Sequence, residues 1–349
     1  MPADIDKAGP QAGFMKRALI ASLIFVSVVA AAGLLWLIAS YLLIVFAAIL
    51  LAILLDGIAK GIGRMLPISR PWRIGLALIV FFASIGAIGL MIPGIAAQTP
   101  QFASYLEQGV DWFRNNVLSL PSVQQSLENG GSGELMKLLP DPAGLIGGTA
   151  KLIGGTIGML TGMVLILVLG IYLASQPSRY YQGALRLFNP QIRENLAETA
   201  EDIGQILRRW LVAQILMMLI VGVGSYIVLT SLGVPLALML SFIAGLAAFI
   251  PYIGPVIGGG AMILVAAAQD LSLGLIVLGF YAGFQIVESY LLTPLIQSRA
   301  IFIPPALVIF AQVVFGVLFG ILGVALATPL AAVIAVIVSR HYLNEPVKH

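Results

Sequence analysis

A break inside a long apolar run constrains the fold of this chain more than any other feature. The run extends from Val234 to Ala268, and the ten residues from Pro251 to Gly260 include two prolines and four glycines. Neither Pro251 nor Pro255 can donate the backbone hydrogen bond of a continuous helix, so the helix must break there. An unsatisfied backbone group in hydrocarbon costs several kcal/mol. We therefore expect the break to lie against protein or a water-filled cavity, and to be the place where the molecule handles a solute.

Composition assigns the chain to the integral membrane proteins. Hydrophobic residues make up 60% of the sequence and charged residues 9%, whereas soluble domains carry about 25% charge. The absence of cysteine excludes disulfides, thiol nucleophiles and thiolate metal sites. We expect an all-α, polytopic protein with about eight hydrophobic helical segments, because apolar helices of about 20 residues cross a bilayer with every backbone group paired.

Polar stretches divide the chain into parts. Ala18–Ile38, Tyr41–Leu55 and Ile74–Ile92 are expected to be the first three membrane helices, and Asn189-Pro190 to begin a helix that continues into the fifth. The expected parts are an N-terminal tail (1–17), membrane helices 1–3 (18–95), an extracytoplasmic helical insert (96–150), membrane helix 4 (151–175), an amphipathic helix (176–209), a membrane core (210–339) and a tail (340–349).

The insert is expected to be helical because its apolar residues recur at spacings of three and four. It would form a packed cap or lie on the membrane surface. The residues of this apolar face are Phe102, Leu106, Val110, Phe113, Val117 and Leu120.

Basic residues indicate the orientation. The N-terminal tail has three, the loop from Asp56 to Arg73 four and Ser178–Arg209 five, while residues 96–150 have two against five acids. By the positive-inside rule the first three segments and both termini are cytoplasmic. Two topologies remain open for residues 234–268: a single crossing with a broken middle, or a re-entrant hairpin, which the position of Arg299 favours. In the second case Ala306–Val338 also returns on itself.

The residue inventory argues against enzyme chemistry. The only histidines are His341 and His349, both near the C-terminus, so neither a zinc-binding His-Glu-x-x-His helix nor a serine–histidine dyad can form at membrane depth. The chain has no phosphate-binding loop of the Gly-x-x-x-x-Gly-Lys type and no concentrated basic face for nucleic acid. We expect no cofactor and no metal.

Glu288 is the candidate for chemistry, because it lies inside an otherwise uncharged span. Gln285 precedes it by three residues and shares its helical face. An ionisable residue at this depth is costly and marks a functional site by default, although a structural hydrogen bond to a carbonyl freed at Pro251 is an equal alternative. Gln214 and Gln312 also lie inside spans, where such residues usually join helices.

Glycines at helical spacing predict close helix packing and a homo-oligomer. Small residues four apart let two helices approach closely, and packing within one protomer explains them equally well. The glycines concerned are Gly154, Gly158, Gly162, Gly316 and Gly320.

Several motifs together point to one family. They are Gly-Leu-Ala-Ala-Phe-Ile-Pro-Tyr-Ile-Gly-Pro-Val-Ile-Gly (245–258), Gln285-Ile-Val-Glu288 with Pro294, Ile296 and Pro305, and Gly320-Ile-Leu-Gly323 leading to Ala327-Thr-Pro329. These motifs, and the layout of spans around an insert, resemble the AI-2E family of bacterial transporters over about Leu165–Val338. The family's basic residue before Pro305 is matched only loosely, by Arg299. The resemblance implies a multi-helix transporter, in a family linked to autoinducer-2 export and to sodium/proton exchange.

We therefore expect an exporter of a small polar solute in the bacterial inner membrane, with proton coupling through Glu288. The alternatives are a cation/proton antiporter and a non-transporting accessory protein whose insert binds a partner. The expected binding partners of the protein are the lipid bilayer, a polar solute or cation, and further copies of the chain. The expected pathway residues are Pro251, Tyr252, Gly254, Pro255, Gln285, Glu288 and Pro294.

Overall fold

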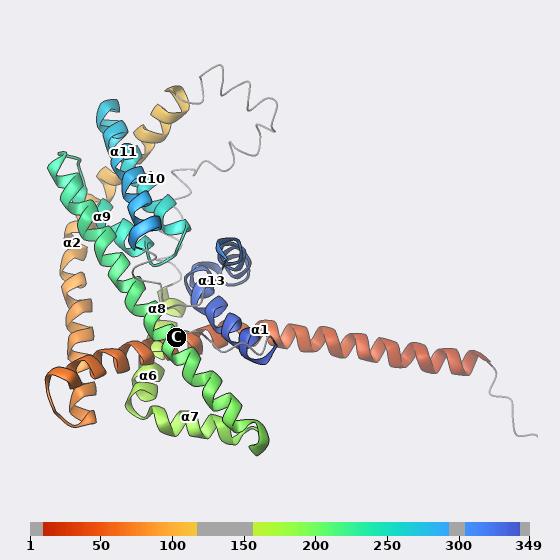
Figure 1. The fold of residues 1–349 in the computed structure, drawn as a ribbon. Helices are drawn as coiled ribbons and strands as arrows, with labels where there is room; N and C mark the ends of the chain where they lie inside the picture. Colours follow the sequence, from red (N-terminus) through yellow and green to blue (C-terminus); the bar gives the residue numbers. More distant parts are fainter. Residues whose placement is uncertain (1–9, 117–155, 293–303, 343–349) are drawn as a thin grey trace, which may run out of the picture. The chain divides into compact units, whose positions relative to one another are not determined.

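A computed structural model describes residues 10–116, 156–292 and 304–342, and every regular element in these ranges is a helix (Figure 1). The all-α prediction is therefore confirmed for the described part of the chain. The chain divides into two compact units, Met1–Phe46 and Ala47–His349. The described part of the first unit is the N-terminal portion of helix α1, and the features below belong to the second unit.

Helices α1 (Pro10–Met65) and α2 (Arg70–Asn116) are longer than the sequence suggested. Two membrane helices were expected within α1, but it continues through Ser40 because no proline or glycine lies between Gly33 and Gly57. Helix α2 likewise continues through Pro93 and Pro100. A proline removes one helical hydrogen bond and often only kinks the helix.

The described part of the expected insert is the C-terminal portion of α2. Its apolar face packs on helix α10, with Leu106 and Val110 both 7% exposed. The approach is close, because a Cβ at Gly109 would lie 2.5 Å from the Leu264 carbonyl oxygen. This part of α2 is therefore packed against protein, as a cap would be, but its position outside the membrane stays a prediction. Residues 117–150 lie outside the described residues, so a separate external insert stays a prediction.

Helices α6 (Thr156–Ser175), α7 (Pro177–Arg186) and α8 (Pro190–Ser231) follow. Asn189 caps α8 as expected, since its side chain accepts a hydrogen bond from the Gln191 N–H at 3.2 Å and Pro190 occupies the first helical position. The helix then runs without interruption from polar sequence into apolar sequence.

Helices α9 (Ala237–Ala247) and α10 (Ile253–Gln269) form an antiparallel hairpin. Two glycines allow the close approach: a Cβ at Gly254 would lie 2.0 Å from the Ala247 carbonyl oxygen, and one at Gly258 would lie 2.8 Å from the Ala244 Cα. Successive contacts move forward on α10 and backward on α9, so the chain doubles back. This geometry is that of the hairpin topology rather than of a broken span that continues in one direction.

The C-terminal helices contain further irregularities. Helix α11 (Leu271–Val287) passes directly into a π-helix, η1 (Glu288–Leu292). Helix α13 (Pro305–His341) bends at Gly320, whose φ of 64° and ψ of −148° lie in a region that only glycine adopts readily. A Cβ at Gly323 would lie 2.0 Å from the Phe315 carbonyl oxygen, so the two halves of α13 fold sharply together at this bend.

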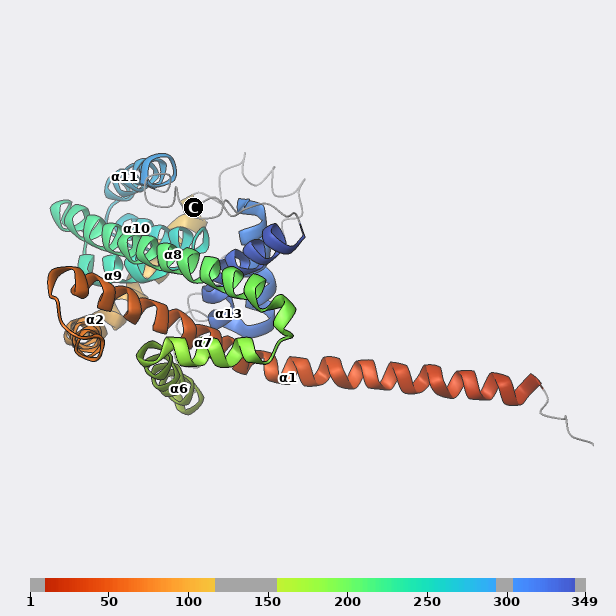
Figure 2. The ribbon, with the colours of Figure 1, turned by 60° about the horizontal axis from the view of Figure 1, so that its bottom comes forward.

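Five described helices are long and apolar enough to cross a membrane, or six if the bent pair α6–α7 is one span. The expected number was about eight. The number is lower among the described residues because Leu19–Ala31 in α1 and the hairpin helices α9 and α10 are each shorter than a membrane-spanning helix. Each helix from α8 to α11 packs against the next one along the chain (Figure 2). Together with Leu106 of α2 they form an apolar cluster.

Candidate functional site

The tip of the α9–α10 hairpin is a strained turn centred on Tyr252. The Ile253 N–H donates to the Pro251 carbonyl at 2.8 Å, and Tyr252 has φ 65° and ψ −50°. These values define a γ-turn with positive φ, a rare conformation for a residue other than glycine. In the described part of the chain only Leu236, at the start of α9, shares this property. Leu236 precedes α9 and Tyr252 precedes α10, so each helix of the hairpin begins after a residue with positive φ. Such backbone strain concentrates at functional sites.

Side chains from three other helices bind the carbonyls around the turn. Gln214 of α8 donates through Nε2 to the Ala248 carbonyl, and Gln312 of α13 donates through Nε2 to the Pro251 carbonyl at 2.8 Å. The hydroxyl of Tyr281, on α11, donates to the Pro255 carbonyl at 2.8 Å. The break is therefore stabilised by contacts with distant parts of the sequence.

The two carbonyls expected to lose their partners both have protein partners. The Ala247 carbonyl accepts a hydrogen bond from the Ile250 N–H at 2.9 Å, and the Pro251 carbonyl accepts from both Ile253 and Gln312. A carbonyl oxygen has two lone pairs, so the acceptor capacity of Pro251 is filled. The expected bond from Glu288 to this carbonyl is absent among the described residues, because Gln312 occupies that place.

The unsatisfied acceptors at the break are instead two glutamine side chains. Gln214 is 3% exposed and Gln312 is fully buried, and the Oε1 atom of each has no hydrogen-bond partner among the described residues. A buried polar atom without a partner costs about 1–3 kcal/mol, and each such atom calls for a functional or structural explanation. Sequence reasoning treated both residues as helix contacts, since spacing alone cannot show which carbonyl a side chain reaches.

The register between α10 and α11 places Glu288 near the hairpin tip. A Cβ at Gly274 would contact Ala267, and one at Gly259 would lie 2.1 Å from the Tyr281 ring. From Gly274 to Tyr281 the chain moves seven residues forward on α11, while the contact on α10 moves back from Ala267 to Gly259. If the two helices continue in this register, seven more residues on α11 lead to Glu288, near the level of Tyr252.

Glu288 itself begins the π-helix and is partly buried. The side chain of Gln285 lies within hydrogen-bonding reach of its carboxyl group. π-Helical turns occur frequently at functional sites. Tyr281, Gln285 and Glu288 form a polar stripe on an otherwise apolar helix, and the stripe leads from the Pro255 carbonyl toward the hairpin tip.

The remaining predicted residues have different positions. Pro294 and Gly154 lie outside the described residues, whereas Gly158 and Gly162 lie on α6. A Cβ at Gly316 would lie 2.8 Å from the Val324 side chain across the bend of α13, whereas Gly320 has no neighbour within 4 Å among the described residues and instead forms the bend itself.

No group of three or more His, Cys, Asp or Glu side chains suited to a metal occurs in the ranges that the structure describes. The oxygen atoms at the break are therefore those of amides and backbone carbonyls, with Glu288 the nearest carboxyl along the polar stripe. Such a set can hydrogen-bond a polar solute or coordinate a hard cation, but it offers no thiolate or imidazole ligand.

At one end of the second unit, ion pairs join segments that are distant in sequence. Arg340, in the last turn of α13, contacts Asp202 at 2.7 Å and Glu198 at 2.5 Å, both on α8. Arg208 of α8 contacts Asp56 of α1 at 2.7 Å. The C-terminal part of α1, the polar part of α8 and the end of α13 therefore lie near one another. The side of the membrane on which they lie stays a prediction.

Apolar helices of membrane-spanning length, combined with a helix that breaks against buried polar side chains, define a polytopic membrane protein of the transporter class. The comparison with known proteins makes the assignment specific. The sequence profile of the AI-2E family transporter matches residues 24–343, and the chain belongs to this family. The resemblance noted in the motifs is thereby confirmed.

Relatives in other bacteria have names of the same kind. A protein of Mycobacterium tuberculosis named as a candidate transport protein, MT0215, is 27% identical over 91% of this chain and 88% of its own length. Two candidate transport proteins of Bacillus subtilis are also similar. YueF is 22% identical over 72% of this chain and 69% of its own, and YrrI is 25% identical over 73% of each.

Proposed function

We propose that the protein exports a small polar solute, of the autoinducer-2 type, across the bacterial inner membrane. The observation that supports this proposal is the pair of buried amide oxygens of Gln214 and Gln312, which have no partner among the described residues. Both flank the hairpin tip, because their amide nitrogens are bound to carbonyls three residues apart. A hydroxylated solute would satisfy these acceptors by donating hydrogen bonds, which an apolar solute cannot do.

Glu288 supplies the proton coupling in this proposal. It follows a span without other charges, close to Gln285, and the register between α10 and α11 extrapolates to a position near the hairpin tip. A carboxyl group at membrane depth can bind a proton on one side of the membrane and release it on the other. The strained turn at Tyr252 is the hinge: relaxing it would move the hairpin tip relative to Glu288 and change the side from which the site is open.

The orientation and assembly are part of the same proposal. Both termini are proposed to lie in the cytoplasm, and the excess of basic residues in the N-terminal tail, the loop after α1 and Ser178–Arg209 supports this orientation. The protein is expected to act as a homo-oligomer, because many apolar side chains, such as Leu90 and Val317 at 85% and 82% exposed, lie on the surface of one protomer. Lipid would cover the part of this surface that other protomers do not.

The test is efflux of labelled autoinducer-2 from proteoliposomes that contain the wild-type chain or Glu288→Gln. The variant should lose most of its dependence on a proton gradient, because glutamine cannot exchange a proton. Glu107→Gln is the matched control, since Glu107 is exposed on α2 and away from the hairpin tip. If Glu288→Gln shows efflux with an unchanged pH dependence, Glu288 has no part in the mechanism. If the wild type shows no efflux, autoinducer-2 is not the transported solute.

A sodium or lithium/proton antiporter is the second candidate. The observation that favours it is chemical: the unpartnered groups at the break are carbonyl-type oxygens, which hard cations prefer as ligands. Addition of sodium or lithium to vesicles that hold a pH-sensitive dye distinguishes the two candidates. A pH response that requires Glu288 supports antiport, and the absence of a response excludes it.

A further inference from the structure

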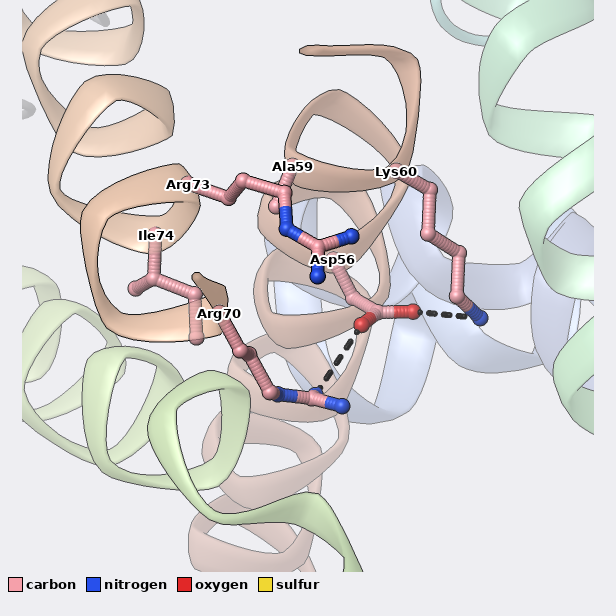
Figure 3. Close-up of a pocket in the computed structure, with 6 residues that line it drawn as sticks. All are labelled: Asp56, Ala59, Lys60, Arg70, Arg73 and Ile74. Atoms are coloured by element: carbon pink, nitrogen blue, oxygen red, sulfur yellow. Dashed lines mark hydrogen bonds and ion pairs between the residues drawn. The ribbon is translucent and has the colours of Figure 1, made fainter. Parts of the chain in front are cut away.

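A second polar site, separate from the hairpin, surrounds Asp56 where α1, α2 and α8 meet (Figure 3). The carboxylate of Asp56 contacts Lys60 at 2.9 Å, Arg70 at 3.2 Å and Arg208 at 2.7 Å. Its side chain is 17% exposed, whereas those of Lys60 and Arg70 are about half exposed. One carboxylate therefore holds three cationic groups around it.

A fourth cation, Arg73, adjoins the same site without an ion pair to any described residue. It lines a cavity of about 80 Å³ together with Asp56, Ala59, Lys60, Arg70 and Ile74. Figure 3 shows the Arg73 guanidinium above the Asp56 carboxylate, with no bond drawn between them. The Nε atoms of Arg73 and Arg208 are both buried and have no hydrogen-bond partner among the described residues.

The charges at this site do not balance. Lys60, Arg70, Arg73 and Arg208 carry four positive charges, against the single negative charge of Asp56. Like charges this close repel each other, and the repulsion is stronger when the groups are partly removed from water. A purely structural network would need only enough cations to neutralise Asp56. The excess indicates that a second anion belongs in the cavity.

Gly63 leaves room for the Arg73 side chain at this place. A Cβ at Gly63 would lie 2.5 Å from an Arg73 guanidinium nitrogen, so the guanidinium lies directly over the backbone at Gly63. Any larger residue there would displace it. The short connection between α1 and α2 brings Gly63 and Arg73 together, which explains why basic residues on both sides of the connection converge on one cavity.

Exposed apolar side chains close to the cavity in sequence favour a position at a membrane surface. Trp72, adjacent to Arg73, is 73% exposed, and Met65 and Leu66 in the connection are 85% and 49% exposed. Tryptophan is enriched at the membrane–water interface, where its ring lies at the level of lipid headgroups. The cations of the Asp56 site and the interfacial tryptophan are therefore close together.

We propose that the Asp56 site binds the phosphate group of an anionic lipid headgroup. Arginine guanidinium groups bind phosphate oxygens through paired, charge-assisted hydrogen bonds, and basic pockets between membrane helices on the cytoplasmic side are suited to such headgroups. The phosphate would accept hydrogen bonds from Arg73 and Arg70. Its acyl chains would extend along the exposed apolar surface beside Trp72.

The thermal unfolding midpoint of the full chain in a neutral detergent tests this proposal. Added phosphatidylglycerol should raise the midpoint, and phosphatidylcholine, which has no net charge, should not. Arg73→Gln should weaken lipid binding and so raise the half-saturating phosphatidylglycerol concentration about fivefold. This is the change expected for the loss of one basic side chain near a membrane surface. Arg64→Gln is the matched control, because Arg64 is exposed in the last turn of α1, across the short connection from Arg73, and does not line the cavity.

Two further variants test the charge and the competing carboxylate. Arg73→Lys keeps the charge but cannot make the paired hydrogen bonds, so it should keep only part of the shift in midpoint. Asp56→Asn removes the competing carboxylate and should tighten lipid binding, even if the lipid-free protein becomes less stable. Native mass spectrometry of the wild type gives a result that does not depend on the folding of any variant, with phosphatidylglycerol retained in preference to phosphatidylcholine.

The proposal fails if both lipids give the same shift, if Arg73→Gln behaves like Arg64→Gln, or if Asp56→Asn leaves the lipid affinity unchanged. Inorganic phosphate is the remaining comparison. A shift of equal size with phosphate alone, lost in Arg73→Gln, would assign the site to a free anion and overturn its assignment to lipid.

Discussion

Replacement of Gln312 by methionine should separate the contribution of this side chain to protein stability from its contribution to transport. Methionine has a similar length and volume, so the fully buried position stays filled. The variant loses the 2.8 Å hydrogen bond from Nε2 to the Pro251 carbonyl. It also loses the Oε1 atom, which has no partner among the described residues.

The two losses have opposite effects on the free energy of unfolding. A hydrogen bond contributes about 0.5–1.5 kcal/mol, and bonds between membrane helices average about 0.6 kcal/mol. The Pro251 carbonyl keeps its bond from Ile253, so the cost lies at the lower end of that range. Removal of an unpartnered buried oxygen returns about 1–3 kcal/mol. The expected variant is as stable as the wild type, or up to about 2 kcal/mol more stable.

The rate of transport should fall in Gln312→Met, although stability does not. If the Gln312 Oε1 contacts the solute, loss of that hydrogen bond should slow efflux about tenfold, the factor that corresponds to about 1.4 kcal/mol. The measurements are the thermal unfolding midpoint in detergent and solute efflux from proteoliposomes. Gln98→Met is the matched control, because the Gln98 Oε1 on α2 is also buried and unpartnered among the described residues. It should show a similar stability change and normal efflux.

Two outcomes would refute this reasoning. If Gln312→Met unfolds more easily by 2 kcal/mol or more, Gln312 is chiefly a structural clamp and its oxygen has a partner that stabilises the fold. If the variant transports at the wild-type rate, the Oε1 atom is not part of the solute pathway.

The other predictions concern contacts between helices. Gly254→Ala should prevent correct folding of the hairpin, because its Cβ would lie 2.0 Å from a backbone oxygen and overpacking costs about 1–3 kcal/mol or more. Gly260→Ala on the same helix has open space and should stabilise the protein by about 0.5–1 kcal/mol; equal midpoints for the two variants would contradict the hairpin geometry. Arg340→Gln should lower the unfolding free energy by about 1–3 kcal/mol, because it leaves Asp202, with a side chain 12% exposed, without this cation. An unchanged denaturation midpoint would show that the ion pair is dispensable.

Local chemistry made several features predictable from sequence. Asn189 and Pro190 predict the start of α8 because one caps a free N–H and the other lacks one. The interval without proline or glycine from Leu34 to Asp56 should likewise have predicted one continuous helix in α1, and the expectation of two helices was wrong for that reason. Prolines were given too much weight in α2, where Pro93 and Pro100 lie within the helix.

The identity of the polar groups at the candidate site could not be predicted in the same way. Gln214 and Gln312 reach carbonyls 34 and 61 residues away in sequence. Spacing within one helix says which side chains share a face, but not which backbone atom of another helix that face meets. Glu288 attracted attention because of its charge, whereas two neutral amides make the direct contacts with the break.

By itself the sequence determined that the chain is an α-helical membrane protein with a discontinuity near Pro251, because two prolines and four glycines within ten residues strongly disfavour a continuous helix. Pro255 lies inside the first turn of α10, where a proline is tolerated. Only the tertiary structure decided the direction of the chain after the break and the partners of its carbonyls. The approach of Gly254 to Ala247 sets the hairpin, and Gln214, Gln312 and Tyr281 bind the carbonyls. These contacts depend on packing between helices that are distant in sequence, which no local rule of backbone geometry specifies.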